Sequence, residues 1–475
     1  MATQPSISYS ITVRLEVTAR GNAVSQLTHA VEEAGGVVTA LDVTASGSSG
    51  LRIDVTCAAT DTAHAKQLTE ALSRVEGVVI GKVSDRTFLM HLGGKIEVQP
   101  KMPIRNRDDL SMIYTPGVAR VCLALAENPD DARRLTIKRN TVAVVTDGSA
   151  VLGLGNLGAI PALPVMEGKA ALFKRFAGID AFPICLDTQD VEEIVRTVEL
   201  IAPVFAGINL EDISAPRCFE IERRLREKLD IPVFHDDQHG TAIVVLAALL
   251  NALKVVKKDL ASVRIVMSGA GAAGMAVLAV LMEAGATDVV VADKEGVIHP
   301  RRAGLSPELV SVAERTNRTG VTGDLRAALS GADVFVGLSA PNLLSGADIA
   351  TMAEGSIVLA LANPVPEVDP LAAAEHASVV ATGRSDFPNQ INNVLAFPGV
   401  FRGLLDAQSH IITLDMLIAA ARALADVVHA DELNASYIVP SVFHPDVAAT
   451  VAAAVSAAVR AGGTALPTGE YPTSA

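Results

Sequence analysis

The sequence has no tryptophan and fewer basic than acidic side chains. Its 39 Lys and Arg stand against 53 Asp and Glu, which gives a formal net charge of −14 at pH 7. A nucleic-acid groove needs a basic surface, and aromatic side chains often stack on its bases. We therefore expect no nucleic-acid partner.

Cysteine is scarce as well. The chain has 4 cysteines in 475 residues, and no two of them have the close spacing of a disulfide framework or a metal knuckle. We expect four reduced thiols, at Cys57, Cys122, Cys185 and Cys218.

Long apolar runs and a leader segment are also missing. The longest apolar stretches, such as residues 242–250, are shorter than the ~20 residues that span a bilayer. The first residues, M-A-T-Q-P-S-I-S, contain no basic region followed by an apolar core. We expect a soluble, cytoplasmic protein with no membrane partner.

The chain is long enough for two to four domains, and 50% hydrophobic with 19% charged residues is typical of a folded protein. We predict three domains, at residues 1–90, 91–257 and 258–475. The fold class is α/β, with mixed α/β structure in the middle domain and packing helices at residues 414–429 and 445–461.

The first domain has the element order βαββαβ. It is expected to contain strands at residues 9–17 and 78–83, two strands around residues 47–50, and helices at residues 23–34 and 63–75. This order resembles the ACT domain, a small regulatory module that pairs across a dimer and binds an effector near the first strand-helix turn, here residues 19–22. The alternative is a plain interaction domain, since such units serve that purpose too.

Two acidic pairs follow apolar, strand-like runs in the middle domain. Asp236 and Asp237 lie in V-F-H-D-D-Q-H-G-T-A, and Glu211 and Asp212 follow residues 204–210. Adjacent carboxylates repel unless a cation neutralises them. Oxygen ligands from two segments favour Mg²⁺ or Mn²⁺ over zinc. The alternative is that both pairs cap helices.

Two segments match G-x-G-x-x-G. In the second, Gly269-Ala-Gly271-Ala272-Ala273-Gly274, the first glycine follows the apolar run at residues 263–268 and the third opens an apolar helix, which places a diphosphate at a helix N-terminus. The first match, residues 153–158, is separated from its strand and is followed by two prolines. We do not interpret it as a dinucleotide loop.

Asp293 lies 24 positions beyond Gly269, at the end of the next strand. A carboxylate there accepts hydrogen bonds from the adenine ribose, which favours NAD. Lys294, Arg301 and Arg302 are close along the chain and leave NADP open. Further apolar strands at residues 333–336, 356–361 and 378–380 predict a Rossmann-type, doubly wound parallel sheet.

Residues 100–401 resemble the malic enzymes, with the family's motifs in the family's order. The resemblance implies oxidative decarboxylation of L-malate to pyruvate and CO₂, reduction of NAD or NADP, and a bound Mg²⁺ or Mn²⁺. It rests on Tyr114-Thr-Pro-Gly-Val-Ala, Thr146-Asp-Gly-Ser, residues 153–158, Glu167-Gly-Lys-Ala, Glu211-Asp212, His235-Asp-Asp-Gln-His-Gly-Thr-Ala, Ala362-Asn-Pro and Thr382-Gly-Arg-Ser-Asp-Phe-Pro-Asn-Gln-Ile-Asn-Asn.

By this resemblance Lys169 is the general base for the C2 hydroxyl, paired with Asp236. The pairing alone raises the lysine pKa, so a metal or burial must outweigh it. Without the resemblance, Lys169 on a helix is a surface residue. The resemblance also implies that Glu211, Asp212 and Asp237 bind the metal.

The resemblance makes Tyr114 the general acid that protonates C3 of the enolate; alternatively it is a core tyrosine before a Pro-Gly turn. Asn363 and Asn393 resemble the asparagines that contact the substrate and the nicotinamide ribose, although Asn363 before a proline also favours a simple turn. Many long eukaryotic members hold a malate carboxylate with an arginine where this chain has Ala150. We assign that task to Arg384 as a hypothesis.

Two other activities remain open. A malolactic enzyme would use the same residues but retain the NADH and reduce pyruvate to lactate. A catalytically silent protein would only bind an effector at its first domain. In either case we expect a homodimer or a larger assembly.

Overall fold

The structure is a computed structural model that describes residues 5–18, 22–47 and 50–463. The chain forms two compact units, Met1–Val98 and Gln99–Ala475. Each unit is described by itself.

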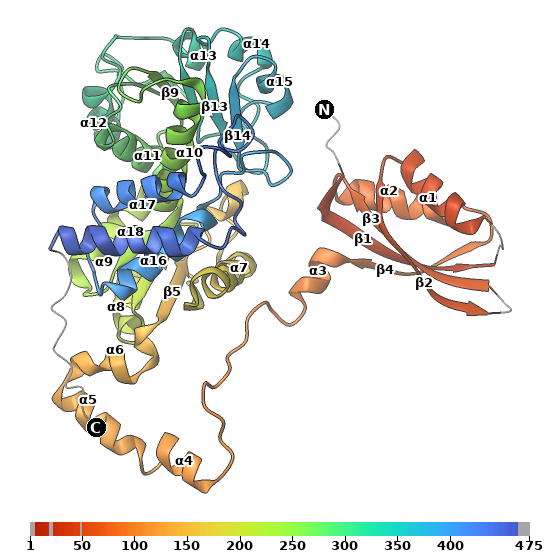
Figure 1. Cartoon of the computed structure of the whole chain (residues 1–475), viewed down its shortest axis with the longest axis horizontal. Coiled ribbons are helices and arrows are strands. Elements are labelled where there is room, and N and C mark those ends of the chain that lie inside the picture. The colour runs from red at the N-terminus through yellow and green to blue at the C-terminus, as the bar shows by residue number, and fades with distance from the viewer. Residues whose placement is uncertain (1–4, 19–21, 48–49, 464–475) are drawn as a thin grey trace. The chain divides into compact units, whose positions relative to one another are not determined.

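The first unit is an antiparallel sheet with strand order β2-β3-β1-β4. β1 alternates, with Val13 and Leu15 buried and Arg14 exposed, so that one face of the sheet is apolar. Helices α1 and α2 cover that face (Figure 1). The elements are β1 (Ser6–Val17), α1 (Ala23–Glu33), β2 (Val37–Gly47), β3 (Gly50–Ala59), α2 (Thr62–Ser73), β4 (Val78–Asp85) and α3 (Arg86–His91).

The predicted order βαββαβ is confirmed. The likeness to ACT domains stays a prediction. Most of the turn to which we assigned effector binding, residues 19–21, lies outside the described residues.

The second unit contains a parallel sheet with strand order β6-β5-β7-β8. β5 and β7 are buried at every position, as a parallel sheet covered on both faces requires. Helices α8 and α9 pack on one face and α7 on the other. The elements are β5 (Thr141–Thr146), α7 (Ala159–Ala177), β6 (Asp180–Cys185), α8 (Val191–Ile201), β7 (Gly207–Leu210), α9 (Arg217–Lys228) and β8 (Val233–His235).

The same unit contains the predicted doubly wound sheet, with order β11-β10-β9-β12-β13-β14 and only β11 antiparallel. The strand order reverses between β9 and β12, where such folds bind their ligands. The strands are β9 (Arg264–Ser268), β10 (Asp288–Asp293), β11 (Gly296–Val297), β12 (Val334–Gly337), β13 (Ile357–Ala360) and β14 (Val379–Thr382). The helices are α11 (Ala272–Glu283), α12 (Pro307–Arg315), α13 (Leu325–Leu329), α14 (Gly346–Ile349) and α15 (Pro370–Ala374).

Four helices join the two parallel sheets into one hydrophobic core. The ring of Phe173 on α7 lies 4.7 Å from that of Phe397 and 5.2 Å from that of Phe401. The C-terminal helices therefore pack on the half of the unit that carries α7 (Figure 1). A domain boundary at residue 257 stays a prediction. The four helices are α10 (Thr241–Val256), α16 (Phe397–Asp406), α17 (Leu414–Asp426) and α18 (Val447–Ala461).

Among the described residues, the helical stretch Asp236–Val256 is long and apolar enough to cross a membrane. Of its most apolar window, 67% is buried inside the protein. α10 therefore has the composition of a core helix because it packs against α11 and α17.

Two helices before β5 have no buried residue, α4 (Arg107–Ile113) and α5 (Val118–Glu127). The short helix α6 (Ala132–Leu135) connects them to the first sheet of the second unit. We call residues 102–127 the arm.

Candidate active site

The two acidic pairs meet at one edge of the first parallel sheet. β7 and β8 are neighbours, and their last residues, Leu210 and His235, are in register. The residues that follow these strands therefore lie side by side. Glu211, Asp212 and Asp237 each offer a ligand oxygen, and these oxygens lie within 4.8 Å of one another.

The backbone around the acidic pairs is adapted to this edge and does not use them as helix caps. Asp236–Gly240 forms a π-helical turn before α10, in which no side chain caps the helix. A Cβ on Gly240 would lie 2.0 Å from Asp236 Oδ1, so only glycine fits there. Asp212 has a left-handed φ of 54°, and its N–H donates to Asp237 Oδ2 at 2.8 Å. The capping alternative is therefore wrong.

Burial makes the charge of this cluster costly. It raises the pKa of Glu211 to about 7 and that of Asp236 to about 6. Burial and mutual repulsion also raise the pKa values of Asp212 and Asp237. Asp212 Oδ2 and Asp236 Oδ1 are buried without a hydrogen-bond partner. An oxygen-only donor set with unpartnered oxygens fits Mg²⁺ or Mn²⁺.

Lys169 on α7 is buried among these groups rather than on the surface. Its side chain is 10% exposed, and its Nζ lies 2.5 Å from Asp236 Oδ2 and 2.9 Å from Glu211 Oε1. The ring centroid of Phe397 is 4.3 Å from Nζ. Burial lowers the pKa of Lys169, but the two carboxylates outweigh it and raise the pKa above its ordinary value.

Glu211 therefore has two contacts, because it belongs to the ligand triad and also pairs with Lys169. The expected contact between Lys169 and Asp236 is present. Asn209 Nδ2 donates to the other oxygen of Glu211 at 2.9 Å and fixes its orientation.

The two asparagines lie on different segments. Asn393 is beside the π-helical turn, where its Nδ2 donates to Asp236 O at 3.4 Å. Asn363 is exposed after β13. A Cβ on Gly153 would lie 2.5 Å from Asn363 O. The glycine loop at residues 153–158, which is not a dinucleotide loop, therefore borders the crevice at this asparagine.

The second glycine loop has the geometry of a diphosphate site. Gly269 directly follows β9 with φ 108°, and a Cβ on Gly274 would lie 2.0 Å from Gly269 O. Gly271 is the N-cap of α11 and offers no side-chain cap, so the first N–H groups of the helix are open to an anion. Ala272 and Ala273 form the first turn.

Asp293 ends β10 and is paired with an arginine. Arg302 Nη1 and Nη2 lie 2.8 and 2.5 Å from its two carboxylate oxygens. Both side chains are mostly buried. Lys294 and Arg301 are exposed, so Arg302 is the cation nearest to the ribose-binding carboxylate.

Two predicted site residues are not brought to the acidic cluster. Tyr114 lies between α4 and α5 and is 69% exposed, so it is not a core tyrosine. Arg384 pairs with Asp386 through Nε at 2.8 Å and Nη2 at 2.5 Å, and stacks over Phe387.

Glu367 was missed by the sequence analysis. It is fully buried and accepts hydrogen bonds from Ser339 N at 2.9 Å and Ala362 N at 3.0 Å. It thus joins the loops after β12 and β13, which border the switch point. A single glutamate in a proline-rich loop gives no local signal of this contact.

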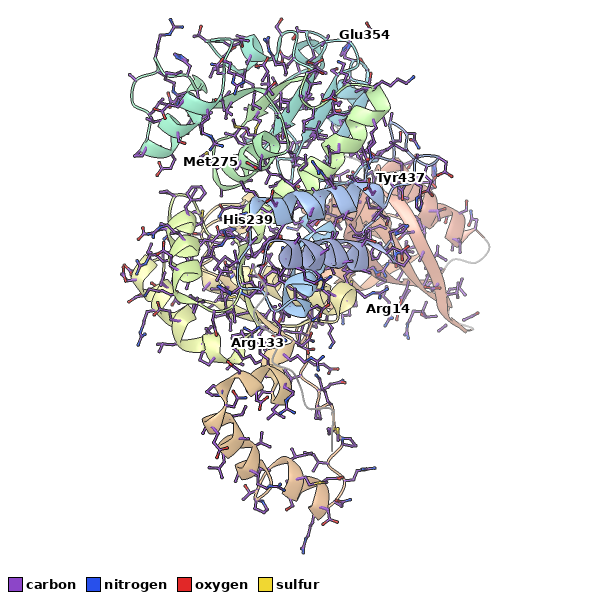
Figure 2. The ribbon with its side chains drawn as sticks, turned by 60° about the vertical axis from the view of Figure 1, so that its left-hand side comes forward. Arg14, Arg133, His239, Met275, Glu354 and Tyr437 are labelled. Carbon is purple, nitrogen blue, oxygen red and sulfur yellow. The ribbon has the colours of Figure 1, made fainter. Side chains whose placement is uncertain are left out.

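A hollow of 680 Å³ lies between α9, the π-helical turn and α11. His239 and Met275 line it (Figure 2), but Lys169 and the metal-binding carboxylates do not. We do not assign it to the active site.

Comparison with known proteins agrees with this geometry. Residues 93–226 match the malic enzyme N-terminal domain and residues 238–460 the malic enzyme NAD binding domain. The chain is 54% identical over 463 residues to the NAD-dependent malic enzyme of Geobacillus stearothermophilus, covering 97% of each chain. It is 52% identical to the bifunctional malic/malolactic enzyme of Bacillus subtilis, covering 78% of this chain and 91% of that one.

A solved structure supports the same assignment. The NAD-dependent malic enzyme of Thermotoga maritima is 47% identical with a TM-score of 0.75, over 78% of this chain and 99% of that one. The chain therefore belongs to the malic enzyme family, whose reaction is the oxidative decarboxylation of malate.

Proposed function

We propose that the chain oxidises L-malate to pyruvate and CO₂ with NAD, using Lys169 as the general base and Glu211, Asp212 and Asp237 as ligands of Mg²⁺ or Mn²⁺. The observation that carries this proposal is the buried Lys169, because its partner Glu211 belongs to the ligand triad. Base and metal site are thereby joined through one carboxylate.

A divalent cation bound there supplies the polarisation of the C2 oxygen and of the adjacent carboxylate of malate. It also neutralises the carboxylates that raise the pKa of Lys169. Burial then acts on the lysine with less opposition and lowers its pKa. Lys169 accepts the C2 hydroxyl proton as the hydride leaves, and Asp236 holds its Nζ in place.

The remaining roles follow from position. The diphosphate of NAD binds at the start of α11, and Asp293 binds the adenine ribose. Asn363 and Asn393 contact the substrate and the nicotinamide ribose. Tyr114 protonates C3 of the enolate.

Arg384 binds a malate carboxylate in exchange for Asp386, its present partner. An Arg384→Ala variant with an unchanged KM for malate would exclude this role.

The test is an initial-rate measurement with malate, comparing NAD with NADP and Mn²⁺ with EDTA. We expect one NADH and one pyruvate for each malate, a preference for NAD, and loss of the rate in EDTA. A rate that persists without divalent metal would exclude the proposed site.

A malolactic activity is the second candidate, because a relative that is 52% identical is a bifunctional malic/malolactic enzyme. The same assay distinguishes the two reactions. Lactate formation without net NADH release would favour the malolactic reaction.

We also propose that Met1–Val98 is an ACT-like regulatory module and that the enzyme is a homodimer or larger oligomer in the cytoplasm. The antiparallel βαββαβ sheet supports a module with its own core. Deleting this unit should abolish any effector response and spare the malate-dependent rate.

A further inference from the structure

We propose that Tyr114 acts in the active site of a second copy of the chain, onto which the arm docks. This inference rests on the proposed role of Tyr114 as the general acid. Each copy would give its own arm and receive the arm of its partner, as a two-fold dimer requires.

The arm is an apolar surface without a partner in its own chain. Tyr114 is 69% exposed, and large apolar side chains on both sides of it are exposed too. Together these exposed fractions amount to roughly 800 Å² of surface, which is what one partner buries in a standard interface. The other side chains are Met102, Ile104, Leu110, Met112, Ile113 and Leu123.

The arm starts at the edge of the sheet opposite to the acidic cluster. Lys138 Nζ donates to Phe205 O at 2.9 Å, and Arg133 Nη2 donates to Asp230 O at 3.3 Å. These carbonyls precede β7 and β8, whereas the acidic pairs follow them. A strand of six residues separates the two edges by about 20 Å. The geometry therefore places the arm far from its own Lys169.

A second apolar surface lies next to the active site. We call it the patch; it is formed by the 153–158 loop and the start of α7, the helix that carries Lys169. Ala150, just before it, donates its N–H to Asp212 O at 2.9 Å. The most exposed member, Ile160, is 84% exposed. The patch consists of Leu152, Leu154, Leu157, Ile160 and Leu163.

The arm and the patch thus supply two exposed apolar surfaces, one carrying the tyrosine and one bordering the base. Apolar surface of this extent seldom stays uncovered on a soluble monomer. Docking the arm of one copy on the patch of another covers both surfaces and brings Tyr114 towards the cluster that lacks it.

Hybrid dimers test this directly. Two differently tagged chains are co-expressed, and the species that carries both tags is purified. In a hybrid of Tyr114→Phe with Lys169→Ala, one site combines the intact lysine of one chain with the intact tyrosine of the other. We expect about half of the wild-type rate per dimer, because one of two sites is complete.

The matched control pairs the wild-type chain with the Tyr114→Phe/Lys169→Ala double variant. Here neither site has both residues if Tyr114 acts across the interface, so we expect almost no activity. An active control with an inactive first hybrid would show that Tyr114 serves its own chain, and would overturn the inference while leaving the proposed function intact.

Two further outcomes would also overturn it. Wild-type activity of the Tyr114→Phe homodimer would remove the proposed role of Tyr114 and this inference with it. Failure to recover any doubly tagged species would show that the chain does not pair. An Ile160→Arg variant, which alters only an exposed side chain, should sediment as a smaller species and lose activity while keeping its circular-dichroism spectrum.

Discussion

At the scale of single residues, the acidic ligands were predictable because oxygen donors directly follow two apolar runs. The local sequence marks both features. The second contact of Glu211 was not predictable, since Lys169 and Asn209 reach it from other segments. The same holds for Glu367, whose two hydrogen bonds depend on the packing of β12 beside β13.

The pair Asp293 and Arg302 yields a prediction about the cofactor. Removing the carboxylate in Asp293→Ala removes its repulsion of a 2′-phosphate and releases Arg302 to bind that phosphate. We expect NADPH affinity to rise and NADH affinity to fall, each about tenfold, or 1.4 kcal/mol. Fluorescence titration of the two reduced cofactors measures this.

The control is the double variant Asp293→Ala/Arg302→Ala, which lacks both the repulsion and the released cation. It should gain much less NADPH affinity than Asp293→Ala. An equal gain in both variants would exclude Arg302 as a phosphate ligand.

At the scale of elements, local pattern fixed most of the helices and strands. α10 has the predicted bounds because small and apolar residues continue without interruption from Thr241 to Val256. The π-helical turn before it was not predictable, because it depends on contacts with Asp212 and α11. The arm was not predictable as a separate element, since its apolar residues gave no sign of what covers them.

The junction of α9 with the π-helical turn should make stability depend on pH. Burial raises the pKa of Glu222, but contacts with His239 and Arg226 outweigh it and lower the pKa to about 2. Its folded pKa thus lies below the value of about 4.3 in an unfolded chain. The stabilisation is present above that value and is lost as the pH falls towards 2.

A Glu222→Gln variant keeps the shape of the side chain and removes its charge. We expect it to cost on the order of 3 kcal/mol at pH 7, seen as an apparent Tm several degrees lower than that of the wild type. The difference should shrink at pH 3.5. A difference that is the same at both pH values would show that the charge of Glu222 does not stabilise this junction.

At the scale of the whole molecule, the order of the sheets could be predicted from the glycine loop, the strands and the family motifs. The packing of the C-terminal helices on α7 could not, because Phe397 and Phe401 meet Phe173 only through long-range contacts. That packing places an aromatic ring beside the Lys169 ammonium group and closes the site on one side.

The central claim is that Asp237 holds the metal whereas the adjacent Asp236 holds the base. Mn²⁺ titration of Asp236→Asn and Asp237→Asn, together with NADH-forming rates at saturating Mn²⁺, tests it most directly. Asp237→Asn should weaken Mn²⁺ binding at least about tenfold. Asp236→Asn should bind Mn²⁺ within about threefold of wild type and lose about 100-fold in kcat. Equal weakening of Mn²⁺ binding in both variants, or unchanged binding in Asp237→Asn, would contradict this division.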